Sequence, residues 1–229
     1  MKKDLIVAVI VAVLLTGISY LVAGAAGWIP DGVNWLEAAA VFTSYACTYL
    51  CVRQRRINYP IGAISTAMYC ILFVQYGLIA SAVLNGYLVF SLIYGWIRWR
   101  SDENARPVTH VQPKWWIAYG SVTLAAWGGA MLIVLLLGGV LNPADAVILA
   151  GTILAQFLLD NKKIETWFVW AVVNVAAIYV YFSTGLPLAG FQYIFFLANT
   201  VYGYIEWRRS MNPPSLDEYD DDGWHTEVL

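Results

Sequence analysis

Four residues in the second half of the chain combine aromatic rings and an amide at helical spacing. Trp170, Asn174, Ala177 and Tyr181 are separated by four, three and four positions, so their side chains share one face of a helix. The rings can stack on a flat ligand or attract a delocalised cation, and the amide can bond its polar groups. Such a face suits a flat, polar ligand with hydroxyl groups.

Residues that could support catalysis or bind a metal are scattered. His110 and His225 fall in a central loop and in the C-terminal tail, with no Cys/His ligand spacing nearby. Cys47, Cys51 and Cys70 lie in apolar runs, which favours small core residues over a disulfide framework or a zinc site. A membrane enzyme would need a positioned base, nucleophile or metal, so we expect no enzyme activity and no cofactor.

The composition is typical of a membrane protein. Of the 229 residues, 60% are hydrophobic and 12% are charged, against about 25% charged in an average soluble domain. So few charges cannot cover an ordinary core with a polar shell. The net charge of −2 also lacks the positive field that nucleic-acid binding requires, which excludes nucleic acid as a partner.

Apolar segments long enough to cross a bilayer, about 20 residues each, predict an all-α polytopic membrane protein. The expected segments are Leu5–Gly27, Asn34–Val52, Ile57–Gln75, Leu78–Ile97, Trp115–Leu137, Pro143–Leu159, Ile164–Ser183 and Leu186–Ile205. Tryptophans gather near their ends, where rings anchor in the headgroup region. The expected anchors are Trp28, Trp35, Trp96, Trp99, Trp115, Trp116, Trp167 and Trp207.

The basic residues predict the orientation in the membrane. All 13 occur in five clusters at alternate ends of the segments, from Lys2-Lys3 to Arg208-Arg209. Lys and Arg in short loops stay in the cytoplasm, so both termini should be cytoplasmic. The first segment also resembles a secretory signal with Ala23-Gly24-Ala25 as its cleavage site. Its apolar run is long for a signal, and we expect a retained helix bound to membrane lipid.

The chain contains an internal repeat at an offset of 108 residues. Tyr94–Arg100 aligns with Tyr202–Arg208 with five identities in seven positions. Each unit holds three segments, so an intervening segment is needed to restore the direction of the second unit. The sequence therefore predicts a parallel 3+1+3 repeat preceded by one extra helix. The expected divisions are 1–30 (N-terminal helix), 34–100 (first repeat), 101–141 (loop and linker helix), 142–209 (second repeat) and 210–229 (acidic, solvated tail).

The same offset pairs the face around Trp170 with a second face in the first repeat. It aligns Gly62 with Trp170 and Asn85 with Tyr193. We expect the two faces to form one substrate site. Its candidate residues are Thr66, Tyr69, Phe73, Asn85, Trp170, Asn174, Tyr193 and Asn199. The competing interpretation is that these Asn and Thr side chains only join helices by hydrogen bonds.

Acidic residues are expected only near the ends of the segments. Two pairs of residues fit helix caps with a carboxylate in the first turn rather than an ion site. The pairs are Asn34 with Glu37 and Asn142 with Asp145. Asp160 also falls at a predicted end. Without an ionisable group at mid-depth there is no evident proton or sodium relay, which predicts passive transport.

Several motifs resemble the PnuC-type nicotinamide riboside transporters. They are Asn58-Tyr-Pro-Ile-Gly62, Tyr76-Gly-Leu78, Ile93-Tyr-Gly-Trp-Ile-Arg-Trp99 and Lys163-Ile-Glu-Thr-Trp-Phe-Val-Trp-Ala-Val-Val-Asn174, within a resemblance that covers Asn34 to Arg209. The resemblance implies substrate contacts from Trp170 and Asn174 in one repeat, and from the region of Thr66, Phe73 and Asn85 in the other. One departure is Asn85, where the family's stretch leads us to expect a glutamine.

The resemblance also implies the function. It implies a vitamin permease of the bacterial inner membrane with a fold shared with the sugar-facilitating SWEET proteins, assembled as a homotrimer. Transport would be facilitated diffusion of nicotinamide riboside, trapped by a separate cytoplasmic kinase. The alternatives are the same fold acting on thiamine, riboflavin or a deoxynucleoside, and a membrane scaffold or receptor without a cavity.

The predicted topology can be tested by cysteine accessibility. Single cysteines placed between residues 101 and 114 should react only from the cytoplasmic side, because basic residues flank this loop. A cysteine at Gly139 should react only from outside. Labelling of the 101–114 loop from outside would contradict the topology.

Overall fold

The structure of the chain is a computed structural model that describes residues 2–29, 32–99, 107–138, 143–183 and 187–211. Within these residues the long helices match the predicted segments to within three residues at each end, except that the last helix continues six residues beyond its predicted end at Ile205, to Met211. The helices are α1 (Lys2–Ala25), α2 (Trp35–Val52), α3 (Asn58–Gln75), α4 (Ile79–Arg98), α5 (Trp116–Leu136), α6 (Pro143–Asp160), α7 (Thr166–Ser183) and α8 (Pro187–Met211), with a short 3-10 helix, η2 (Pro113–Trp115), before α5. The all-helical fold class is confirmed.

Five of the described helical stretches are long and apolar enough to cross a membrane. They are α1, α2, α4, the stretch Pro113–Leu136 that contains α5, and α7. In α6 the apolar part Val147–Asp160 is shorter. The sequences of α3 and α8 include Ser65, Thr66, Gln192 and Asn199. These polar residues lower the apolarity of the two helices, which pack against the apolar helices of the bundle.

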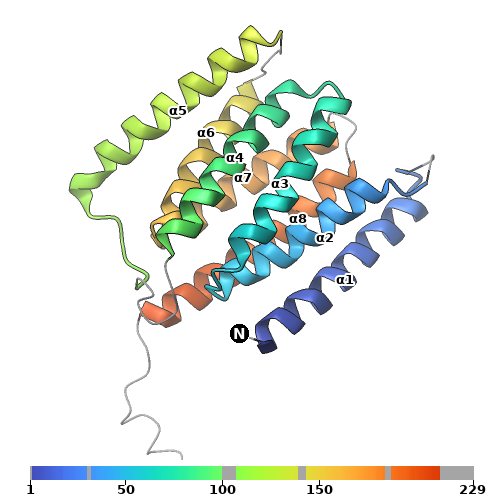
Figure 1. Ribbon diagram of the computed structural model, residues 1–229, viewed down its shortest axis with the longest axis horizontal. Helices are drawn as coiled ribbons and strands as arrows, with labels where there is room; N and C mark the ends of the chain where they lie inside the picture. Colours follow the sequence, from blue (N-terminus) through green and yellow to red (C-terminus); the bar gives the residue numbers. More distant parts are fainter. Residues whose placement is uncertain (1, 30–31, 100–106, 139–142, 184–186, 212–229) are drawn as a thin grey trace, which may run out of the picture.

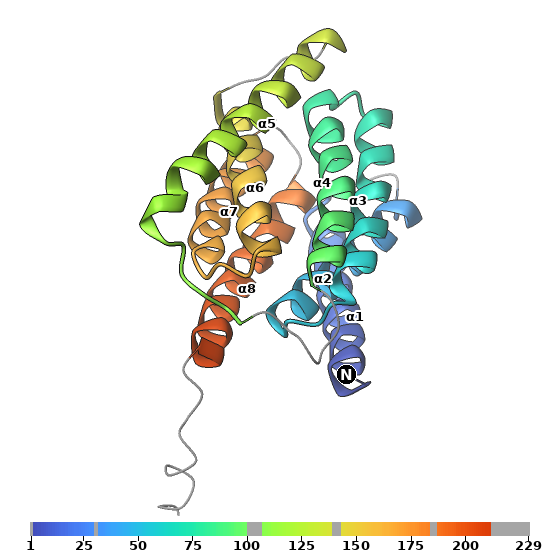
Figure 2. The ribbon, with the colours of Figure 1, turned by 60° about the vertical axis from the view of Figure 1, so that its left-hand side comes forward.

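The helices form two three-helix units. In the first unit α3 packs on α2 and α4, and in the second α7 packs on α6 and α8. Figure 2 shows the two units side by side, with α1 beside the first unit and α5 on the outside of the second. Contacts of α2 with α8 and of α4 with α6 join the units. The chain order of the units in Figure 1 is the one that a 3+1+3 repeat requires.

Two equivalent tryptophan hydrogen bonds connect the units at one end. The indole N–H of Trp99 donates to the carbonyl oxygen of Asp160, and that of Trp207 donates to the carbonyl oxygen of Val52, each at 3.2 Å. A shift of 108 residues converts one bond into the other, because it takes Trp99 to Trp207 and Val52 to Asp160. The 108-residue repeat is therefore present in the contacts between the units as well as in the sequence.

A third contact lies between the units and involves two further equivalent positions. The Nζ of Lys162 donates to Oε1 of Gln54 at 3.2 Å, and these residues are also 108 positions apart. Both have left-handed backbones, with φ of 50° and 52°. The turns that follow α2 and α6 therefore have the same conformation in the two units.

The prediction that tryptophans anchor the interface is wrong for three residues. Trp99, Trp167 and Trp207 are buried, with exposed fractions of 6%, 4% and 0%. They form one aromatic cluster, in which the rings of Trp167 and Trp207 meet edge-on at 5.2 Å. Their position at helix ends predicted anchoring. The ends of the two units instead meet at this cluster, so that neither lipid nor water reaches the three rings. Trp35, which is 81% exposed, keeps the surface position expected of an anchor.

The N-terminal helix is integrated into the fold. Ser19 of α1 shares a 2.9 Å hydrogen bond with the hydroxyl of Tyr45 in α2. The Asp4 carboxylate forms ion pairs with Arg53 at 3.3 Å and Arg55 at 2.7 Å. These contacts join α1 to α2 and to the turn that follows α2.

The predicted cap at Asn34 is confirmed, because its Oδ1 accepts the amide N–H groups of Leu36 and Glu37 at 3.0 and 3.3 Å. The predictions for Asn142, for the side chain of Asp145 and for the tail at 212–229 concern parts of the chain outside those that the structure describes.

Close packing at Gly95 gives a stability prediction. A Cβ built on Gly95 would lie 2.5 Å from Oδ1 of Asp160 and would also overlap the ring of Tyr59, whereas a Cβ on Gly86 of the same helix meets nothing within 4 Å. Gly95→Ala should destabilise the protein by about 1–3 kcal/mol, the usual cost of overpacking. A lower melting temperature of Gly95→Ala in detergent would show this. Gly86→Ala is the matched control, and equal melting temperatures for the two variants would contradict the packing.

Candidate substrate cavity

A cavity lies between the two units, enclosed by α2, α3, α4, α6, α7 and α8. Its volume is about 210 Å³, whereas a single water needs only about 10–15 Å³ measured in this way. Lining residues come from most of the length of α3, from Asn58 to Phe73, and of α7, from Trp167 to Tyr181. The space therefore admits a ligand of many atoms.

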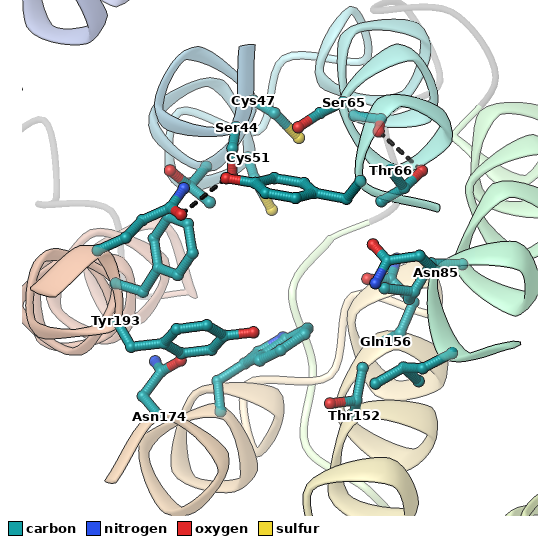
Figure 3. A pocket seen from close by; sticks show the side chains of 18 of the residues that line it. Ser44, Cys47, Cys51, Ser65, Thr66, Asn85, Thr152, Gln156, Asn174 and Tyr193 are labelled. Atoms are coloured by element: carbon teal, nitrogen blue, oxygen red, sulfur yellow. Dashed lines mark hydrogen bonds between the residues drawn. The ribbon is translucent and has the colours of Figure 1, made fainter. Parts of the chain in front are cut away.

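The structure brings all the predicted site residues to this one cavity. The eight lining residues from the prediction are Thr66, Tyr69, Phe73, Asn85, Trp170, Asn174, Tyr193 and Asn199. Figure 3 shows Asn174 and Tyr193 facing Asn85 across the open space. Their common location is established, and their contact with substrate stays a prediction.

Sequence reasoning missed the contribution of α2 and α6. Ser44 and Thr48 of α2, with Thr152 and Gln156 of α6, also line the cavity, and Figure 3 places Thr152 and Gln156 beside Asn85. The repeat offset could have found them, because 44 and 48 become 152 and 156 when shifted by 108. In all, 11 pairs of lining residues obey this shift, which accounts for 22 of the 28 residues.

Two of the three amides among the predicted site residues also join helices. Nδ2 of Asn174 donates to the hydroxyl of Thr200 at 2.9 Å, linking α7 to α8. Nδ2 of Asn199 donates to the carbonyl oxygen of Thr48 at 3.4 Å, linking α8 to α2. Their roles as helix contacts and as lining residues coexist, since these bonds fix the orientation of each amide.

Thr66 and Asn85 behave differently. The hydroxyl of Thr66 bonds the Gly62 carbonyl at 3.0 Å, and Nδ2 of Asn85 bonds the Ser81 carbonyl at 2.8 Å, both one turn back on the same helix. These bonds do not join helices. The side chains can therefore offer their remaining capacity to a ligand.

Aromatic rings line both units. Tyr69 and Phe73 of α3 are stacked with centroids 5.7 Å apart and planes 19° apart. Across the cavity, Tyr181 of α7 and Tyr193 of α8 have centroids 5.3 Å apart. Trp170, also on α7, is half-buried. These electron-rich faces suit a flat ring, including one with a delocalised positive charge.

A buried carboxyl group lies just beyond the cavity. Asp160 is fully buried at the end of α6. Its oxygens accept hydrogen bonds from Tyr59 at 3.1 Å, Ser91 at 3.0 Å and Gln156 at 2.8 Å. Sequence reasoning placed Asp160 correctly at a helix end but did not predict its burial between the units. Three donors from within the bundle hold this carboxyl, and Asp160 is not among the residues that line the cavity.

The cavity lining carries no formal charge. Among its 28 described residues there is no Lys, Arg, His, Asp or Glu. No group of three or more His, Cys, Asp or Glu that could hold a metal ion occurs in the part of the chain that was described. The lining offers amides, hydroxyls, thiols and rings, which can form hydrogen bonds with a ligand and stack on it.

The fold and the cavity define a multi-span helical membrane permease with an uncharged central site. Residues 34–209 match the family model of nicotinamide mononucleotide transporters, and the chain belongs to this family. Membership confirms the expectation of a transport protein rather than an enzyme.

Individual relatives agree with this assignment. The nicotinamide riboside transporter PnuC of Escherichia coli (strain K12) is 24% identical, covering 82% of this chain and 89% of that protein. The riboflavin/roseoflavin transporter RibM of Streptomyces davaonensis is 28% identical over 53% of this chain and 62% of its own length. A crystal structure of the vitamin B3 transporter PnuC has a TM-score of 0.73 and 24% identity, covering 93% of this chain and 98% of that chain. The fold is therefore shared.

Two substitutions test the predicted site residues. Trp170→Ala removes a stacking face, and Asn174→Leu removes an oriented amide. Each should weaken nicotinamide riboside binding by roughly three- to a hundredfold, given the usual worth of cation–π contacts and buried hydrogen bonds. Calorimetry on purified protein measures this.

The matched control for these variants is Tyr179→Ala. Tyr179 is an aromatic residue of the same helix that is 73% exposed and does not line the cavity. Trp167, buried beside Trp207, is unsuitable as a control. Folded Trp170→Ala and Asn174→Leu variants that bind as tightly as Tyr179→Ala would place the site elsewhere.

Proposed function

We propose that the protein carries nicotinamide riboside across the bacterial inner membrane by facilitated diffusion. The uncharged cavity lined by rings, amides and hydroxyls is the observation that carries this proposal. Nicotinamide riboside combines a flat cationic ring with a carboxamide and a sugar bearing hydroxyls. Aromatic faces attract such a cation, and the amides of Asn85, Gln156 and Asn174 can bond the polar groups.

The riboside fits this cavity better than the mononucleotide from which the family model takes its name. The mononucleotide carries a phosphate group with a charge of about −1.5 to −2 at neutral pH. None of the 28 lining residues is cationic. Burying an unpaired charge costs several kcal/mol even after relaxation, so the cavity selects the unphosphorylated compound.

Phosphorylation in the cytoplasm would then retain the imported substrate. A riboside converted to its 5′-phosphate no longer fits the cavity and cannot return. We therefore propose functional coupling to a cytoplasmic riboside kinase.

The family resemblance also supports a homotrimer. The apolar outer side of α5, where Ile117 and Leu136 are 80% and 77% exposed, faces lipid or a neighbouring protomer.

Riboflavin is the second candidate substrate. The similarity to a riboflavin/roseoflavin transporter and the same uncharged aromatic lining favour it. Riboflavin is a larger, neutral three-ring compound, whereas the riboside has one cationic ring. Competition of unlabelled riboflavin against labelled nicotinamide riboside in liposomes decides between them, and riboflavin displacing the riboside at lower concentration would contradict our proposal.

Discrimination against phosphate tests the proposed substrate. We expect the riboside to bind more than about a hundredfold more tightly than the mononucleotide, because several kcal/mol correspond to at least two factors of ten. Calorimetric titration of both compounds measures the ratio. Comparable affinities would contradict the proposal.

A further inference from the structure

One amide in the cavity has an unused hydrogen-bond donor. Among the buried side-chain nitrogen and oxygen atoms that lack a partner in the described part of the chain, Nε2 of Gln192 and Nε1 of Trp167 belong to cavity-lining residues. Trp167 lies in the aromatic cluster against Trp207 at the closed end. Gln192 is only 4% exposed, and leaving a buried donor unpaired is unfavourable.

Tyr69 holds this amide in a fixed orientation. Its hydroxyl donates to Oε1 of Gln192 at 2.8 Å, across the cavity from α3 to α8. The ring of Tyr69 is itself held by stacking on Phe73. The oxygen end of the amide is occupied, whereas the NH2 end is buried and has no partner, so a ligand that reaches it would satisfy its unused donor. An amide oriented before binding loses little entropy when the ligand arrives.

The position of Gln192 breaks the symmetry of the cavity. The repeat partner of Gln192 is Leu84, which also lines the cavity but cannot form a hydrogen bond with its side chain. Of the 28 lining residues, 22 obey the 108-residue shift, and at this pair the donor is present in one unit only, which favours a ligand with two different ends. A heteroaromatic ring with one polar substituent is such a ligand.

The surroundings of Gln192 indicate which part of the ligand it meets. Tyr193 follows it in α8, and the rings of Tyr193 and Phe196 are 5.3 Å apart. Tyr69 lies opposite. Rings on several sides suit a flat aromatic group, whereas the sugar is better served by Asn85, Thr152 and Gln156, which Figure 3 shows together on the other side.

We infer that Gln192 donates a hydrogen bond to the carbonyl oxygen attached to the ligand's aromatic ring, with Tyr69 as its positioning residue. This inference rests on the proposed function, in which that oxygen belongs to the carboxamide of nicotinamide riboside. Gln192 is thereby a specificity residue that distinguishes ligands with a ring carbonyl from ligands without one.

The test compares two ligands and two variants by calorimetry. The ligands are nicotinamide riboside and N-ribosylpyridinium, which keeps the cationic ring and the sugar but lacks the carboxamide. Gln192→Leu should weaken binding of the riboside by roughly five- to a hundredfold, the usual range for a lost buried hydrogen bond. It should change binding of N-ribosylpyridinium by less than about twofold. Tyr69→Phe should reduce the preference for the riboside in the same direction but less.

The matched control is Gln75→Leu, the same change at an exposed glutamine of α3 that does not line the cavity; it should bind both ligands as the wild type does. Equal losses for both ligands in Gln192→Leu, or no loss for either, would overturn the inference and leave the proposed function intact. A wild-type protein that does not bind nicotinamide riboside at all would overturn the proposed function, and this inference with it.

Discussion

The architecture depends on two hydrogen bonds that close one end of the bundle. The last carbonyl oxygens of a helix have no partner within the helix, and inside a membrane protein no bulk water replaces that partner. Val52 and Asp160 end α2 and α6, and their carbonyl oxygens accept the indole N–H groups of Trp207 and Trp99. Each three-helix unit thus supplies a tryptophan to the end of the other unit's first helix: Trp99 directly follows α4, and Trp207 lies in the last two turns of α8. The two bonds are equivalent under the 108-residue shift.

The cavity follows from this closure. With the units joined through tryptophans at one end, the polar faces of α3 and α8 meet across the space between them, where they escape the cost of facing lipid. The position of these polar faces beside the cavity accounts for the lower apolarity of α3 and α8. In an isolated membrane-spanning helix, the same polar residues would face lipid and be unfavourable. It also explains why the lining is polar but uncharged, since amides and hydroxyls can complete their hydrogen bonds within the bundle, as Asn174 does with Thr200.

Much of the fold could be predicted from the sequence, because the sequence alone shows the length of the apolar segments and the two-unit repeat. The common location of the eight candidate residues followed from helical spacing and the 108-residue offset. Three features could not be predicted in the same way. Trp99, Trp167 and Trp207 occupy helix ends, where spacing alone cannot distinguish a buried cluster from an interfacial anchor. The burial of Asp160 depends on Tyr59 and Ser91, which are far away in sequence. The unpaired donor of Gln192 could not be predicted, because the sequence does not show that the hydroxyl of Tyr69 bonds the oxygen of the same amide.

The central claim is that this uncharged cavity lets nicotinamide riboside equilibrate across the membrane without coupling to an ion. Uptake of labelled riboside into empty proteoliposomes measures this most directly, first at equal pH and ion concentrations on both sides and then with an inward proton or sodium gradient. We predict that the label reaches the external concentration and no more in every condition, for the wild type and for an Asp160→Asn variant that stays folded. Accumulation of unmodified label above the external concentration when a proton or sodium gradient is imposed would contradict the account.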